Sequence, residues 1–314
     1  HKYYVSTRNA CKLCAPLGAC LVFKGIEGCV PMVHGSQGCA TYIRRYTISH
    51  FREPMDIASS NFSEKTTVYG GSHNFITGIN NVIAQYHPKV MGIASTCLAE
   101  TIGEDVPALI RDYQDANTGN KDLPLFVFAS TPSYCGSHID GFHHAVLATL
   151  SSMADNGKQQ THINLLPGMV SPADMRYLHE IMQEFEIDAV LFPDYSKSLD
   201  NVFTHEYQLI PSGGTKIKDI RRTGTAKATI EFGIVFAKAS TRVRATKNTP
   251  TAGEWLQENR YIRNFQMPLP IGINASDHFY NTLCKIGNKK MPEKFVEERG
   301  RLVDSYVDGH KYVF

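Results

Sequence analysis

Several common features are missing from this 314-residue sequence, and each absence narrows what the protein can do. No run of about 18 apolar residues is present, so no segment is a candidate transmembrane helix. The 32 basic and 30 acidic residues leave a formal net charge of only +2, which indicates no surface for a polyanion. We also expect no secretory leader before His1. We therefore expect a cytoplasmic protein whose partners include neither nucleic acid nor membrane.

Two common binding motifs are also absent. There is no G-x-x-x-x-G-K-[ST] sequence, which excludes a phosphate-binding P-loop, and the glycine-rich segment 68–75 is not a dinucleotide fingerprint. Cys11 and Cys14 form a CxxC pair, but no second CxxC exists to complete a zinc ribbon. No strand obviously precedes this pair, so a thioredoxin-like redox site is disfavoured.

Cysteine, in contrast, is plentiful and unevenly placed. Six of the eight cysteines lie in the first 100 residues, which suggests a local purpose. In a reducing compartment they are not expected to form disulfides. Some are expected to be buried as small hydrophobic side chains, and apolar neighbours favour this for Cys20, Cys29 and Cys284.

Apolar runs of strand length alternate with amphipathic helical segments, which predicts an α/β fold with parallel sheets. The predicted strands are 88–96, 123–130, 161–168 and 188–194, and the predicted helices are 99–115, 140–155 and 172–187, the last with Ser171 as its N-cap. The polar segment 154–160 is the predicted boundary between domains at 1–157 and 158–275. Residues 276–314 form a predicted helical segment, ending in "GHKYVF", which resembles the start of a strand.

Four sulfur or oxygen side chains are predicted to gather at one sheet edge. Cys14 and Cys39 stand in glycine- or proline-containing turns, while Cys97 and Ser133 follow two predicted strands. Ligand-contacting residues of α/β folds lie at such carboxyl ends. Soft thiolates there suit an iron–sulfur cluster or zinc, and both alternatives stay open on this argument.

Other residues bear on the same choice. Gly35 and Gly38 bracket the turn before Cys39, where they would let the backbone approach a bulky neighbour closely. A histidine group in "SHIDGFHH" (137–144) is an alternative zinc site, although histidines on a helix more often serve packing or the surface.

Six motifs together resemble a known family, the β-type subunit of nitrogenase component 1. They occur in the same order and register, and they are "CAPLGA", "HGSQGC", "HFREP", "VYGG", "STCLAETIGEDV" and "TPSYCGSH". The resemblance covers essentially the whole chain and returns at 298–310. It implies tandem Rossmann-like domains, with the family's third domain expected to begin where this sequence ends.

The resemblance also implies a cofactor and its ligands. Cys14, Cys39 and Cys97 would ligate a P-cluster of the [8Fe–7S] type at the interface with an α-type subunit, and Ser133 would be a redox-dependent oxygen ligand. Backbone N–H groups of the glycine turn, with Arg44 and Arg45 as nearby cations, could stabilise a negatively charged cluster.

Further roles follow from the same resemblance. Tyr69 would meet the docking ATP-dependent iron protein, and Tyr42 would lie between the cluster and the partner's cofactor. Glu53, Asp304 and Asp308 match a cation site that joins two β-type subunits of an α2β2 heterotetramer. The two aspartates are spaced i,i+4 and share a face if they lie on a helix. No catalytic residue is expected in this chain, because the family's α-type subunit holds the active-site cofactor.

Two classes of function remain open. The favoured one is an oxidoreductase subunit that relays electrons from the iron protein to the partner's cofactor, for reduction of dinitrogen or another small molecule such as a thioether. The alternative is the β-type half of a cofactor-maturation scaffold, which would hold a simpler [4Fe–4S] cluster. Retention of cysteine at positions 14 and 97 favours the reductase. A tetrapyrrole reductase subunit matches less well, and six motifs in register leave little room for a non-redox protein.

Overall fold

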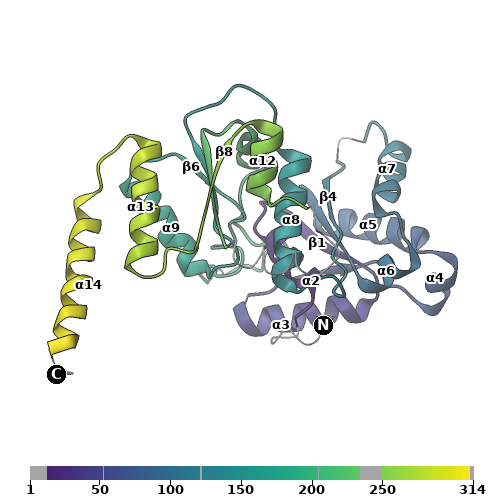
Figure 1. Ribbon diagram of the computed structural model, residues 1–314. Helices are drawn as coiled ribbons and strands as arrows, with labels where there is room; N and C mark the ends of the chain where they lie inside the picture. The colour runs from purple at the N-terminus through teal and green to yellow at the C-terminus, as the bar shows by residue number, and fades with distance from the viewer. Residues whose placement is uncertain (1–12, 52, 121, 204, 234–248, 312–314) are drawn as a thin grey trace, which may run out of the picture.

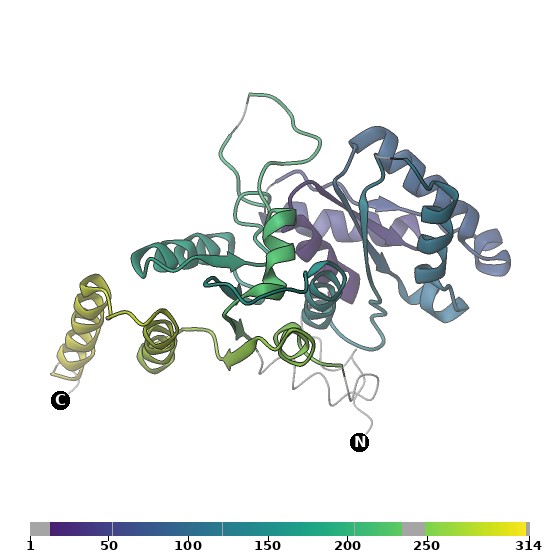
Figure 2. The same ribbon diagram turned by 90° about the horizontal axis from the view of Figure 1, so that it is seen from above.

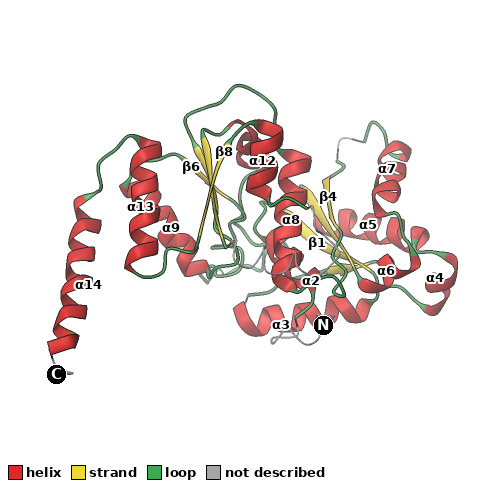
Figure 3. Cartoon of the chain, viewed as in Figure 1, coloured by secondary structure: helices red, strands yellow, loops and turns green. Residues whose placement is uncertain are grey.

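The structure is a computed structural model and describes residues 13–51, 53–120, 122–203, 205–233 and 249–311. Within these ranges the chain forms two sheets of four parallel strands each, with helices packed on both faces (Figures 1 and 3). The predicted α/β class with parallel sheets is confirmed. No helix in these ranges is both long and apolar enough to cross a membrane.

The first sheet has the strand order β2-β1-β3-β4. The elements around it are α2 (Ala15–Lys24), β1 (Cys29–His34), α3 (Gln37–Phe51), β2 (Ala58–Ser59), α4 (Glu64–Tyr69), α5 (Ser72–Tyr86), β3 (Val90–Ser95), α6 (Cys97–Ile102), α7 (Val106–Ala116), β4 (Leu125–Ala129) and α8 (His138–Met153). The two central strands, β1 and β3, are buried along their whole length, as expected for parallel strands covered on both faces. α5 and α7 cover one face and α2 and α8 the other.

The second sheet has the strand order β6-β5-β7-β8. Its elements are β5 (Ile163–Leu166), α9 (Pro172–Glu184), β6 (Ala189–Leu191), α10 (Ile217–Arg222), β7 (Ala228–Phe232), α12 (Ala252–Arg260), β8 (Arg263–Met267), α13 (Ile273–Gly287) and α14 (Glu293–Lys311). Ser171 caps α9 as predicted: its Oγ accepts a hydrogen bond from Asp174 N at 3.1 Å, while Asp174 reaches back to the Ser171 backbone.

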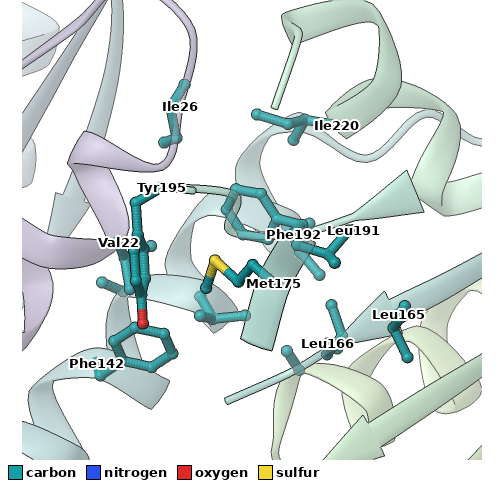
Figure 4. Packing of buried hydrophobic residues seen from close by; sticks show 14 of the residues in the cluster. Val22, Ile26, Phe142, Leu165, Leu166, Met175, Leu191, Phe192, Tyr195 and Ile220 are labelled. Atoms are coloured by element: carbon teal, nitrogen blue, oxygen red, sulfur yellow. The ribbon is translucent and has the colours of Figure 1, made fainter. Parts of the chain in front are cut away.

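The two sheets share one hydrophobic core, because α2 and α8 lie between them (Figures 1 and 2). Figure 4 shows the packing at this interface, where Val22 of α2 and Phe142 of α8 lie beside Tyr195. The Phe142 and Tyr195 rings meet edge to face, with centroids 6.5 Å apart. Backbone pairing between Ile26 and Thr215 adds a polar link between the two units. The predicted boundary segment 154–160 follows α8; the division into domains itself stays a prediction.

One predicted helix is in fact two. The prediction of a continuous helix over 99–115 is wrong, because α6 ends at Ile102 and the next residue, Gly103, has a left-handed φ of +79°. Asp105 then caps α7, accepting a hydrogen bond from Ala108 N at 3.0 Å, and proline stands in the first turn. The chain therefore turns sharply at Glu104, between the two helices.

The end of the chain also differs from its prediction. The segment 309–314 was expected to begin a strand, but α14 continues through Lys311, and residues 312–314 lie outside the described part of the chain. A helical hydrogen-bond pattern that starts at Glu293 thus extends over the polar "GHK" segment. α14 stands apart from both sheets (Figures 1 and 2).

Candidate metal centre

Three cysteines occupy the beginnings of three helices at the carboxyl edge of the first sheet. Cys14 immediately precedes α2, Cys39 lies in the first turn of α3, and Cys97 is the first residue of α6. α3 follows β1 and α6 follows β3, so both begin at the carboxyl ends of neighbouring strands. α2 runs back toward the amino end of β1, which places its own beginning at the same edge. The fold thus brings residues from distant parts of the sequence together.

Ser133 links two of these helix beginnings. It follows β4, and its backbone N–H donates a hydrogen bond to the Cys97 Sγ at 3.1 Å. Its Oγ accepts a hydrogen bond from Ala15 N at 3.1 Å, next to Cys14. An isolated antiparallel bridge between Cys14 and Ser137 holds the same two segments together. Ser133 is therefore in contact with the segments that carry Cys14 and Cys97.

The three thiols are close enough to influence one another electrostatically. Burial raises the pKa of Cys14, and the neighbouring Cys39 and Cys97 raise it further. Cys39 is exposed, but partial desolvation of its thiol also raises its pKa, with Cys97 again adding to the effect. Three thiolates at this edge would repel one another unless a cation neutralised them. The site therefore suits positively charged metal atoms.

A close crossing of α2 and α8 fixes the position of Cys14. A Cβ on Gly18 would lie 1.8 Å from the His138 carbonyl oxygen, and one on Gly141 would lie 1.9 Å from the Ala15 carbonyl oxygen. Only glycine fits at both positions, so the backbones of the two helices can touch. This contact holds the beginning of α2 against the segment that precedes α8.

The two glycines before Cys39 behave differently. A Cβ on Gly35 would lie 2.1 Å from Thr96 Oγ1, so the chain approaches itself closely here, while the predicted approach to a bulky neighbour stays a prediction. Gly38 is helical within α3, and a Cβ there would meet only Ser36 Oγ, at 3.6 Å. Gly38 therefore has ordinary helical backbone angles. Nothing among the described residues of this chain requires glycine at that position.

The aromatic residues assigned by resemblance are both exposed. Tyr42 lies one helical turn after Cys39, and its hydroxyl donates a hydrogen bond to Tyr46 at 3.2 Å. Tyr69 ends α4 and is 82% exposed. Both side chains are therefore available for contact with another protein, and their roles stay predictions.

Arg44 does not face the thiols, contrary to the expectation that it would stabilise a cluster. Its Nε donates to the Met55 carbonyl oxygen at 3.2 Å, and its guanidinium lies 3.4 Å from Asp56. Five positions along α3 separate it from Cys39, which corresponds to roughly 140° around the helix. The side chain is thus directed elsewhere.

The three predicted cation ligands do not meet within the chain. Glu53 accepts a hydrogen bond from Asn201 N at 3.1 Å near the end of α3. Asp304 and Asp308 lie on α14, which is remote from α3 in both views (Figures 1 and 2). α14 is helical at both positions, so the two carboxylates do share a face. A site built from two copies of the chain stays a prediction.

The remaining cysteines and histidines in the described part of the chain do not form a second metal site. Cys20 and Cys29 are buried as predicted, and burial raises the pKa of Cys29 to about 12. Cys284 is half-buried on α13, and Cys11 lies outside the described residues. Among the residues that the structure describes, no three His, Cys, Asp or Glu side chains converge closely enough to hold a single metal ion. The alternative zinc site in 137–144 is therefore not supported.

Sequence reasoning missed Glu100, a neighbour of the cysteine edge. Its Oε1 accepts hydrogen bonds from the hydroxyls of Ser95 and Ser130, the latter at 2.6 Å, which joins the ends of β3 and β4. It also contributes, after burial, to the raised pKa of Cys135. The available signal was its place three residues after Cys97 on the same helix.

Comparisons with known proteins identify the class of protein. The sequence profile described as "Nitrogenase component 1 type Oxidoreductase" matches residues 14–314, so the chain belongs to this family. Within the family it is similar to beta chains of the nitrogenase molybdenum-iron protein. It is 35% identical over 306 residues to that of Clostridium pasteurianum, 34% over 311 residues to that of a Nostoc species and 31% over 315 residues to that of Methanothermobacter thermautotrophicus. The resemblance read from the motifs is confirmed.

These matches cover nearly all of the chain but only part of its relatives. They take in 97%, 98% and 98% of this chain, and 64%, 58% and 66% of the three beta chains. A chain of the solved structure "Nitrogenase Cp1 at pH 6.5" superposes with a TM-score of 0.88 at 35% identity, over 96% of this chain and 63% of that one. A chain of "Nitrogenase Cp1 at pH 5" matches with a TM-score of 0.66 at 16% identity, which shows the fold alone. The chain thus spans less than two thirds of these relatives.

Proposed function

We propose that this chain is the β-type subunit of a nitrogenase or nitrogenase-like component 1 reductase that relays electrons through an iron–sulfur cluster. Electrons would come from an ATP-dependent iron protein and leave for a cofactor in an α-type partner. One observation carries the proposal: Cys14, Cys39, Cys97 and Ser133 come from four separate segments and lie at one sheet edge.

The residues at this edge fit a cluster of several irons better than a single ion. Cys97 raises the pKa of Cys14 and of Cys39, and Cys39 also raises that of Cys14, yet no three ligands among the described residues converge on one point. Thiolate is the usual ligand of iron–sulfur clusters. Cys39 is exposed, so the edge is open to a partner that could supply further ligands. A bound P-cluster would supply reversible electron transfer.

Each residue then has a distinct task. The three cysteine sulfurs would hold iron, with helix N-terminal N–H groups nearby to stabilise negative charge on sulfur. Ser133 Oγ already accepts a hydrogen bond from Ala15 N, which would stabilise this oxygen after loss of its proton. Tyr69 would contact the iron protein. Tyr42 would face the α-type partner, and Glu53, Asp304 and Asp308 would join two β-type subunits through a cation.

The test is to purify the full-length protein anaerobically with its α-type partner and count iron. Electron paramagnetic resonance (EPR) would then be followed through stepwise oxidation. We expect an [8Fe–7S] cluster at the interface of the two subunits, distinguished from iron in the partner's cofactor by its EPR signals, that loses two electrons. Ser133→Ala should alter the oxidised spectrum and leave the reduced one unchanged, while the matched variant Ser49→Ala, on the exposed face of α3, should change neither.

Two results would contradict the proposal. A protein without iron would rule out an electron relay. A four-iron cluster with one-electron behaviour would instead assign the chain to the maturation scaffold.

A further inference from the structure

Glu104 lies at the turn between α6 and α7 and contacts two other segments. Its backbone N–H donates to the Ala99 carbonyl oxygen at 3.1 Å, which closes the end of α6. Its carboxylate accepts a hydrogen bond from Gly71 N at 2.6 Å through Oε1, and Oε2 lies 3.4 Å from His34 Nε2. The Glu104 side chain is only 10% exposed. Because this carboxylate is largely shielded from solvent, its charge-assisted hydrogen bonds hold Gly71 and His34 firmly in position.

His34, at the end of β1, is the second member of the network and is fully buried. Its Nδ1 lies 3.0 Å from Ser60 Oγ, and its ring packs edge-on against Phe62 and Phe75. Burial lowers its pKa, although Glu104 opposes this effect. A neutral ring that donates from Nε2 to Glu104 and accepts at Nδ1 from the Ser60 hydroxyl satisfies every contact. The network is therefore complete without a buried positive charge.

The network holds the backbone next to two of the candidate iron ligands. Ser60 Oγ accepts a hydrogen bond from Gly35 N at 2.9 Å, at the start of the turn that leads to Cys39. The His34 carbonyl oxygen accepts hydrogen bonds from Thr96 N at 3.2 Å and from Thr96 Oγ1 at 3.0 Å, directly before Cys97. Movement of His34 or Glu104 would thus displace both helix beginnings.

The same carboxylate holds the exposed end of α4. Val68 and Tyr69 are 74% and 82% exposed there, and the chain then turns through Gly70, whose φ is +92°. A Cβ on Gly71 would lie 2.6 Å from the Phe62 ring and 3.3 Å from the His34 ring. Gly71 therefore packs closely against the rings of Phe62 and His34, and its N–H donates a hydrogen bond to Glu104. Tyr69 lies two residues before Gly71, whose N–H donates to the Glu104 carboxylate. A displacement of Tyr69 would therefore shift Glu104 through this hydrogen bond.

We propose that Glu104 is a positioning residue that transmits displacement of the exposed α4 end to the helix beginnings of Cys39 and Cys97. The inference rests on the proposed function, in which the iron protein docks at Tyr69. Docking would move Gly71, and the Glu104 carboxylate would carry this shift to His34 and to the end of α6. The cluster ligands would then take the arrangement that favours electron transfer.

The first experiment uses the full complex with its α-type partner and iron protein. The rate of the first electron transfer is measured by stopped flow in wild type, Glu104→Ala, Glu104→Gln and Asp112→Ala, together with iron content and the EPR spectrum of the resting cluster. Asp112→Ala is the matched control, because it removes an exposed carboxylate from α7. We expect Glu104→Ala to keep its iron and its affinity for the iron protein while transfer slows about tenfold. Glu104→Gln keeps an oxygen for Gly71 N and should recover most of the rate.

The second experiment needs no variant. Hydrogen exchange of the wild-type complex is compared with and without docked iron protein, and we expect changes in peptides over 33–40 and 95–104 as well as 66–74. Changes confined to 66–74, or a wild-type rate in iron-replete Glu104→Ala, would overturn the role of Glu104 alone. A wild-type protein without a cluster would overturn the proposed function as well, and it would be recognised before any variant is made.

Discussion

The two sheets have the same strand order but opposite chemistry at their carboxyl ends. In the second sheet, polar groups there satisfy one another: the Tyr195 hydroxyl donates to the Val170 carbonyl oxygen at 2.6 Å, and Asp194 lies 2.8 Å from His179. In the first sheet, the corresponding edge carries thiols, and the pKa values of Cys14 and Cys39 are raised by burial and by their neighbouring thiols. The fold therefore provides the same carboxyl edge in both sheets, and the residues that follow each strand decide whether that edge becomes a binding site.

The largest expected effect is the loss of one thiol from the first edge. Cys39→Ala should abolish the cluster and electron transfer, because the proposed function makes Cys39 a ligand of iron. Cys284→Ala, in the second half of the chain, should leave iron content and the EPR spectrum unchanged. Iron analysis and EPR of the purified complexes measure both. Equal iron content in Cys39→Ala and Cys284→Ala would contradict the assignment of the cluster to the first sheet.

The next effect concerns the helix crossing that supports the first edge. Gly141→Val should destabilise the complex by about 3 kcal/mol, because the new side chain would overlap the Ala15 backbone. Iron content should fall with it, since Cys14 precedes Ala15. Denaturant unfolding followed by circular dichroism measures the loss.

Gly300→Ala is the control for this glycine prediction. A Cβ on Gly300 meets no heavy atom within 4 Å in the described part of the chain, so this helical position should gain up to about 1 kcal/mol. If Gly141→Val lowered the free energy of unfolding by less than an ordinary surface variant does, α2 and α8 would be able to separate without loss of stability.

The smallest effect is expected at the second edge. Burial acts to raise the pKa of Asp194, but hydrogen bonds from His179 and Ser196 outweigh it and lower the pKa overall. The unfolded chain then binds more protons below about pH 4, so stability is lost as the pH falls through the folded-state pKa. Asp194→Asn should lack this part of the acid sensitivity, a change of no more than about 1 kcal/mol.

Urea midpoints measured between about pH 3 and pH 7 would check this slope. Asp200→Asn, which removes a half-exposed partner of Arg176, is the control. An unchanged pH profile in Asp194→Asn would show that the second edge does not depend on this ion pair.

Local patterns in the sequence predicted most of the framework. Buried β3 and the capped start of α9 were both found, because a continuous apolar run and a Ser–Pro pair are local signals. β8 was not, since "RNFQM" is polar and mostly half-buried and becomes a strand only by pairing with β7. The break at Gly103 was missed because helical periodicity continues across it.

The candidate site was predictable in its residue types but not in its geometry. Motif order identified Cys14, Cys39 and Cys97, whereas the direction of Arg44 depends on Asp56, which lies beyond the end of α3. The contacts of Glu104 with Gly71 and His34 join residues 33 and 70 positions apart. Contacts at such separations arise when complete helices and strands pack together, so the hydrophobic periodicity of the sequence does not indicate them.

The core shared by the two sheets bears on cooperativity. Because Val22 and Phe142 pack against side chains of the second unit such as Tyr195, α2 cannot open without exposing that interface (Figure 4). Local opening at Cys14 therefore costs the free energy of separating two sheets, far more than the fraying of one helix end. The second sheet carries no cysteine of the candidate site, yet it sets how often that site can open.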